Sequence, residues 1–290
     1  MDELLDEYNE LLREQEAAII AAIVAILETQ STRLLQRTYD QLQSGQFRLA
    51  VTGTDLSLID PLGPDQSDEI LELFEQLLQG STSLGLDLSA KLSEPVIDTP
   101  VAAAISAEAV VSAARRSRGY LERHARSFAA AVAGGVASGL VRGESVAQLI
   151  REFESKLNLT KSRAEVIVRT ESLRSYNDAV RAFYAQNGVQ LVIYYAVPDD
   201  RTCPYCAAQA GRVFKLGAIR LPRHPQCRCS LAPYSTNQYA TRPAYEAARR
   251  SHRNEVLRYA RDRGIQLDEG PAYFEQSQPL PARKDGKSEH

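Results

Sequence analysis

The four cysteines of this 290-residue chain all lie in one short stretch. They form two pairs, Cys203-x-x-Cys206 and Cys227-x-Cys229, and His224 stands three residues before the second pair. The Cys-x-x-Cys spacing lets two thiolates of one tight turn reach a single tetrahedral ion. The 20 residues between the pairs are close to the separation found in zinc ribbons. The sequence therefore predicts a structural Zn²⁺ site that organises this part of the chain.

Five side chains compete for the four positions of a tetrahedral site. We expect Cys203, Cys206, Cys227 and Cys229 to bind the ion, with His224 as a reserve ligand or a hydrogen-bonding neighbour. Cys-x-Cys is a tighter chelate than Cys-x-x-Cys, so His224 replaces one member of the second pair if that member points away. Four protein ligands would leave no position for water, which argues against a catalytic metal.

Two readings of the cysteines without a metal remain open. Two disulfides would need an oxidising compartment, and the acidic start MDELLDEYNELL does not resemble a signal peptide. A redox dithiol at Cys203 and Cys206 would leave the second pair without a role. We expect synthesis in a cytoplasm, where thiols stay reduced. The most apolar run, residues 17–27, is too short to span a bilayer, so we expect no contact with a membrane.

Apolar periodicity predicts a mainly α-helical chain with a small α+β module near its C-terminal end. Residues 2–43 repeat apolar side chains at intervals of three and four, as one long helix does. Further helices are expected at about 68–79, where Gly80 ends the pattern, and at 161–187 after a cap at Thr160. Short strands are expected at 190–196, 211–214 and 230–232, forming an antiparallel sheet packed on a helix and stapled by the cysteines.

Charge is divided unevenly along the chain. Residues 1–100 carry 19 acidic and 5 basic side chains, whereas residues 101–290 carry 18 acidic and 29 basic ones. Part of the basic excess lies on a predicted helix at 243–264. Such a helix is either a solvated face or a contact for nucleic acid or an acidic partner. The candidate contact residues are Arg249, Arg250, Arg253 and Arg258.

The order of motifs resembles the phage Mu F-protein-like minor head proteins over roughly residues 125–234. The matching elements are Arg169-Thr170-Glu171, Asp200-x-Thr202-Cys203-x-x-Cys206, Gly211 with Phe214, His224-Pro225-x-Cys227-Arg228-Cys229, and Pro233.

The resemblance implies a virion protein of tailed phages, located in the head interior or at the portal vertex. It implies a role in head assembly and in DNA packaging or ejection. The implied partners are the portal protein and the major capsid protein, with several copies per assembly and possible contact with packaged DNA. The resemblance does not imply an enzyme activity.

We expect three segments: an N-terminal helical part at 1–98, a Mu F-like domain at 99–234 with its Cys-rich module at 199–233, and a basic helix with a tail at 235–290. The first helix and the residues from 243 onward are expected to be arms that dock on partners. Arg169, Thr170, Glu171 and Asp200 are expected to support the metal loops by hydrogen bonds.

Two other functions were weighed against a structural head protein. One is a zinc-ribbon protein that binds packaged DNA, which is compatible with the first. The other is a hydrolase or transferase that uses Glu171, Asp200 and His224. The chain has no Gly-rich phosphate loop and no nucleophile elbow, so we expect no enzyme activity.

Overall fold

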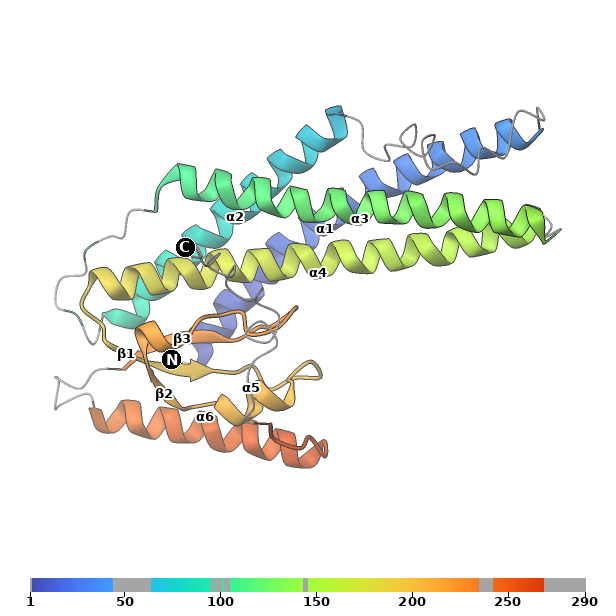
Figure 1. Cartoon of the computed structure of the whole chain (residues 1–290). Coiled ribbons are helices and arrows are strands. Elements are labelled where there is room, and N and C mark those ends of the chain that lie inside the picture. Colours follow the sequence, from blue (N-terminus) through green and yellow to red (C-terminus); the bar gives the residue numbers. More distant parts are fainter. Residues whose placement is uncertain are drawn as a thin grey trace, which may run out of the picture. The chain divides into compact units, whose positions relative to one another are not determined.

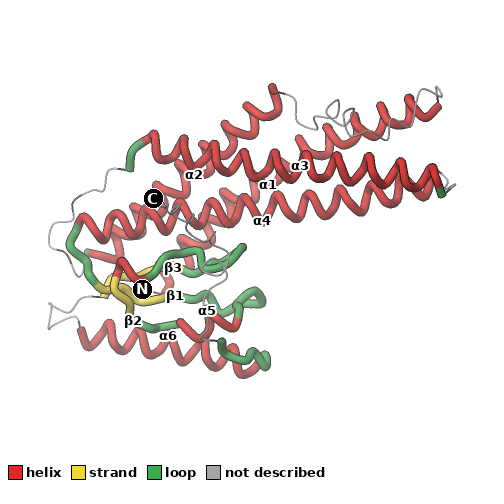
Figure 2. Tube along the Cα trace, in the orientation of Figure 1, coloured by secondary structure: helices red, strands yellow, loops and turns green. Residues whose placement is uncertain are grey.

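The computed structural model describes residues 2–43, 64–94, 97, 101, 105–142, 146–234 and 242–268. Over these residues the protein is mainly helical and has one small antiparallel sheet near its C-terminal end (Figures 1 and 2), which confirms the predicted fold class. None of the helices in this described part combines the length and apolar content that crossing a bilayer requires. The elements are α1 (Asp2–Gln43), α2 (Pro64–Ser93), α3 (Ala107–Val141), α4 (Val146–Gln186), β1 (Leu191–Tyr195), α5 (Pro204–Gln209), β2 (Val213–Lys215), a 3₁₀ turn (Leu216–Ala218), β3 (Ser230–Tyr234) and α6 (Arg242–Asp262).

Backbone contacts divide the chain into two compact units. The helical unit consists of Asp6–Asp87 and Ala103–Ala179. The sheet unit consists of Met1–Leu5, Leu88–Ala102 and Val180–His290. The two units are defined by which parts of the chain pack together. The expected division into segments 1–98, 99–234 and 235–290 rests on motifs and composition, and it stays a prediction.

Each of the four long helices contributes to one apolar core in the helical unit. Ile23 on α1, Phe74 on α2, Leu121 on α3 and Val168 on α4 are at most 1 % exposed and belong to the same cluster. These positions follow the three- and four-residue spacing that lines one face of a helix. The expectation that α1 is a separate docking arm is therefore wrong, because α1 supplies part of this core.

The interior of α2 contains two glycines, of which Gly80 was predicted to end the helix. The helix continues through Gly80 and Gly85 to Ser93, so the predicted stop at residue 79 is wrong. At Gly85 a Cβ would overlap the carbonyl oxygen of Tyr176 on α4. Glycine is present here because the two helix backbones approach closely, and not because the helix ends.

Hydroxyl groups accompany this close approach of α2 and α4. The hydroxyls of Ser81 and Ser172 lie 3.0 Å apart, and those of Thr82 and Ser175 lie 2.8 Å apart. The helix α4 itself runs without a break past Thr160, whose hydroxyl donates to the Lys156 carbonyl at 3.1 Å. The predicted cap at Thr160 is thus an internal hydrogen bond to the preceding turn.

Replacing Gly85 by alanine should destabilise the helical unit. Alanine improves helix propensity by up to about 1 kcal/mol, but the overlap with a backbone carbonyl is expected to cost about 1–3 kcal/mol. Gly134→Ala on α3 is the matched control, because nothing lies within 4 Å of a Cβ there. Urea unfolding should show a lower midpoint for Gly85→Ala and an unchanged or higher one for Gly134→Ala. Equal midpoints for the two variants would contradict this account of α2.

The three strands form an antiparallel sheet, as the sequence predicts, and the structure shows that their order is β2-β1-β3. The central strand β1 pairs with both neighbours, so Ile193 lies opposite Val213 on one side and Ala232 on the other. The Tyr184 hydroxyl near the end of α4 donates to the carbonyl of Leu231 on β3 at 3.2 Å. Both edges of β1 are occupied and four of its five residues are buried, so it is a fixed base for the loop that follows it.

The helix α6 lies beside the sheet (Figure 1) and belongs to the sheet unit. A buried histidine of this helix contacts β1. The imidazole of His252 is 1 % exposed and stacks on the Tyr195 ring with centroids 4.0 Å apart. Its Nε2 accepts the backbone N–H of Ala196 at 3.2 Å. The predicted helix at 243–264 is thus confirmed, but it belongs to the compact sheet unit and is not a free arm.

Two arginines also fasten α6 to the turn before β2. Arg249 donates to the Gly211 carbonyl at 2.9 Å, and Arg253 donates to the Ala210 carbonyl at 2.7 Å. Gly211 has φ of 67°, and a Cβ there would lie 2.8 Å from Cβ of Arg253. Only glycine suits both this conformation and this close approach. The part of the predicted arm at 269–290 lies outside the described residues.

The stability of the sheet unit should depend on pH through His252. Burial lowers the pKa of His252 to about 4, whereas the unfolded chain has the ordinary value of 6.5. The unfolded state therefore binds a proton first as the pH falls. The stabilisation that neutral His252 gives is complete above pH 6.5. As the pH falls from 6.5 to 4 it is lost, and the free energy of unfolding decreases by at most about 3 kcal/mol.

Urea unfolding at several pH values, compared between the native chain and His252→Gln, measures this contribution. The difference in unfolding free energy between the two should shrink as the pH falls through this window. A constant difference would show that His252 does not titrate differently on folding.

Candidate metal centre

The first half of the centre is a turn that opens α5. Cys203 is the N-cap of this helix, and its sulfur accepts the backbone N–H of Cys206 at 3.3 Å. Pro204 stands in the first turn of the helix, where a missing N–H costs nothing. This arrangement brings both sulfurs to one side of the turn. The sequence indicated the turn but not the short helix that follows.

The second half is a turn with the same spacing. The carbonyl of His224 accepts the N–H of Cys227 at 3.2 Å. Pro225 occupies the second position of this turn, and Gln226 occupies the third with φ of 58°. Proline followed by a positive φ is a feature of type II turns. The side chains of His224 and Cys227 are therefore held together, and Cys229 follows just before β3.

The five predicted donors converge. The Nε2 atom of His224 lies 3.2 Å from the sulfurs of Cys203 and Cys206. The sulfurs of Cys206 and Cys227 lie 4.0 Å apart. Donor atoms of Cys203, Cys206 and His224 form one group within 4.8 Å, and those of Cys206, Cys227 and Cys229 form another. All four cysteines are free thiols, so the disulfide reading has no support from the geometry.

Protons are shared unequally among these donors. Hydrogen bonding with the Cys206 side chain, aided by His224, lowers the pKa of Cys203 to about 5. Burial alone would lower the pKa of His224, but contacts with Cys203 and Cys227 raise it to about 10. The cluster thus favours thiolates beside a positive charge. A divalent cation supplies such a charge and binds thiolate and neutral imidazole in place of protons.

Tyr194 is a buried neighbour of the cluster that the sequence analysis missed. Its hydroxyl lies 3.2 Å from the Cys206 sulfur, and its side chain is fully buried. Burial and the surrounding thiolates raise the pKa of Tyr194 well above its usual value, so it keeps its proton and donates to sulfur. Its place in the central strand was the available signal, because alternate residues of a strand face the same side.

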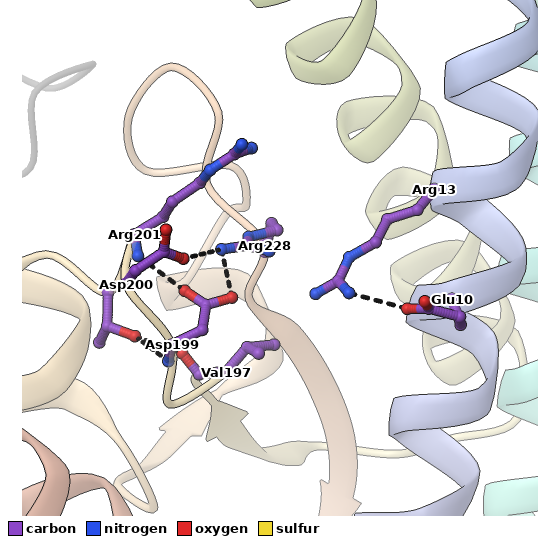
Figure 3. A network of polar contacts seen from close by, with 8 residues as sticks. Glu10, Arg13, Val197, Asp199, Asp200, Arg201 and Arg228 are labelled. Carbon is purple, nitrogen blue, oxygen red and sulfur yellow. Dashed lines mark hydrogen bonds and ion pairs between the residues drawn. The ribbon is translucent and has the colours of Figure 1, made fainter.

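A network of polar contacts shapes the loop before Cys203 (Figure 3). The Asp199 carboxylate pairs with Arg228 and accepts the N–H of Arg201 at 2.9 Å. The Thr202 hydroxyl accepts the N–H of Asp199 at 2.8 Å and donates to the Val197 carbonyl. Because Arg228 lies between Cys227 and Cys229, this network links the two halves of the centre.

A small pocket opens on the cluster. Because part of Cys203 and His224 is exposed, the pocket gives an ion a path from solvent to the donors. The residues that line it are Val197, Asp199, Arg201, Thr202, Cys203, Cys206, His224, Arg228 and Cys229.

The residues predicted to support the centre lie in two places. The Asp200 side chain is 78 % exposed and reaches Arg228 at 3.9 Å, so its neighbour Asp199 makes the closer contact. The other three are on α4. Each of these three contacts a residue about one turn away on the same helix. Arg169 pairs with Glu165, and the buried Glu171 pairs with Arg174. The Thr170 hydroxyl donates to the Val166 carbonyl. Their proposed support of the metal loops stays a prediction.

The four candidate contact arginines of α6 differ in their surroundings. Arg249 and Arg253 donate to backbone carbonyls inside the sheet unit, as described above. Arg250 and Arg258 are exposed, and Arg250 donates to the Glu246 carbonyl of its own helix at 3.1 Å. Only the second pair is thus presented to an outside partner, although no contact of that kind has been tested.

The comparison with known proteins agrees with the motif resemblance. Residues 130–232 match the family described as phage Mu protein F like protein. The match includes all of α4, β1 and β2, the first three residues of β3, and all five donors of the candidate metal centre. Neither a curated protein nor a solved structure matches the chain. The match covers about a third of the chain and supports the resemblance of residues 130–232 to the phage Mu F-like family, which is linked to phage head morphogenesis.

Proposed function

We propose that this protein is a minor head protein that acts structurally at the junction of portal and capsid. The observation that carries the proposal is the family match over residues 130–232. The long helices of the helical unit supply an extended surface for contacts within an assembly. Its partners are the portal protein and the major capsid protein, in several copies per head.

The Cys-rich module is held together by one structural Zn²⁺ in this proposal. Strands of five, three and five residues form a sheet with little core of its own. Small folds of this kind commonly need a metal or disulfides for stability. The converging sulfurs and imidazole are the ligand types that zinc prefers. With four protein ligands the ion has no open position, so its role is folding and not catalysis.

Contact with packaged DNA is a second candidate function. The exposed Arg250 and Arg258 lie two helical turns apart on one face of α6. Arginines in such a position neutralise phosphates without reading sequence, and this binding weakens steeply with salt. The exposure of this pair is the observation that favours it.

Purified heads of the phage that encodes this chain should contain it. Cross-linking followed by mass spectrometry should join it to the portal or major capsid protein, because a minor head protein is built into that junction. A structural protein also remains with the head after washing at high salt. Absence from purified heads would refute the proposal. Cross-links to DNA alone, lost in Arg250→Glu/Arg258→Glu, would favour the second function.

The purified full-length chain should hold about one zinc ion, as a single tetrahedral centre requires. Removing the ion with a chelator should increase hydrogen exchange in residues 191–234 and leave the core of the helical unit protected, because metal binding energy here is folding energy. Cys203→Ser should have the same effect, whereas Lys215→Ser, at an exposed position, should not. Elemental analysis without zinc, or protection unchanged by chelation, would contradict this proposal.

A further inference from the structure

We propose that the ion is bound by Cys203, Cys206, His224 and Cys227, and that Cys229 is not a ligand. The inference rests on the zinc centre proposed above and goes further by choosing among its five donors. It also departs from the four-cysteine set favoured by the sequence.

The first argument is the likeness of the two turns. Cys203-x-x-Cys206 and His224-x-x-Cys227 have equal spacing, and each has a proline directly after its first donor. In the first turn the backbone N–H of Cys206 donates to the Cys203 sulfur at 3.3 Å. In the second turn the backbone N–H of Cys227 donates to the His224 carbonyl at 3.2 Å. Two turns with two donors each complete a tetrahedral site. A Cys227-x-Cys229 pair has no comparable turn.

The second argument is the tautomer of His224. Its Nδ1 lies 2.8 Å from the carbonyl oxygen of Pro225. A carbonyl oxygen only accepts, so Nδ1 carries the hydrogen. In the neutral ring Nε2 then presents a lone pair toward the sulfurs of Cys203 and Cys206. A lone pair facing thiolates is repulsive unless a proton or a metal cation lies between them, so Nε2 stands where an ion would replace a proton. Metal-bound histidines commonly have their other nitrogen fixed in this way.

The third argument is the spacing of the donor atoms. Zinc–sulfur bonds of about 2.3 Å and zinc–nitrogen bonds of about 2.0 Å place tetrahedral ligands about 3.5–3.8 Å apart. The observed separations are 3.2 Å from His224 Nε2 to either sulfur of the first turn, and 4.0 Å from Cys206 to Cys227. Cys227 lies outside the group that Cys203, Cys206 and His224 form within 4.8 Å, so the two turns must draw together for all four to bind one ion. With His224 in a ligand position, a fifth donor has no place.

Cys229 has a different environment. It lies directly before β3 and is 4 % exposed. The Tyr194 hydroxyl, which contacts Cys206, also hydrogen-bonds Cys229. This places Cys229 as a buried thiol beside Tyr194 of β1, at the edge of the pocket onto which the half-buried Cys203 and His224 also face.

X-ray absorption at the zinc edge of the native full-length protein tests the ligand set directly. The expected first shell has three sulfurs near 2.3 Å and one nitrogen near 2.0 Å. Four sulfurs without nitrogen would overturn the ligand assignment and leave the zinc proposal intact. A native protein without zinc would overturn both.

Variants give a second measurement. Cys229→Ala should retain one zinc per chain and an unchanged cobalt spectrum after Co²⁺ substitution. Cys227→Ala and His224→Ala should each lower zinc affinity at least about 100-fold, since even partners of ligands contribute 10–100-fold. In Cys227→Ala the cobalt–thiolate absorption should decrease by the share of one of the three sulfur ligands. Loss of zinc in Cys229→Ala together with full affinity in His224→Ala would refute the assignment.

Discussion

The convergence of sulfur and imidazole donors between two loops is the constraint on which the sheet unit depends. The two turns that carry the donors are separated by 17 residues that include β2. The paired strands are too short to fix both loops by backbone hydrogen bonds alone. In the proposed centre a single ion would join the two turns and so define the path of the chain between them. Because thiolates gathered without a cation repel one another, the fold and such an ion would stabilise each other.

The remaining polar groups of this unit are arranged around the same loops. The Tyr194 hydroxyl donates to the cluster from the sheet, and Arg228 ties the second loop to Asp199 in the first. On the far side of the short helix α5, Arg253 donates to the carbonyls of Ala208 and Ala210, where the helix ends and its carbonyls have no partner in the helix. Arginine is suited to this task because its fork offers several donors in fixed directions.

Much of this architecture could be predicted from the sequence, and the failures have identifiable causes. Long apolar repeats predicted α1, and the cysteine spacing predicted the cluster, because both depend on local periodicity. The continuation of α2 through Gly85 could not be predicted, since the reason for that glycine is a carbonyl on α4, a distant part of the chain. The place of Tyr194 depends on strand pairing, and that of α6 depends on Arg253 meeting a helix end. Tertiary contacts decide all three.

Contacts of this kind also decide how much of the basic excess is available to a partner. The sequence shows a strong basic excess after residue 100, which suggests a positive surface. In the structure Arg228 is neutralised by Asp199, and Arg249 pairs with Glu246 while donating to a carbonyl. Part of the excess is therefore used to hold loops and helix ends inside the sheet unit. Exposed arginines remain on α6, at Arg250 and Arg258, and on α3, at Arg115, Arg116 and Arg126. Positive charge available to an acidic partner therefore lies on particular helix faces and is not a property of the whole region.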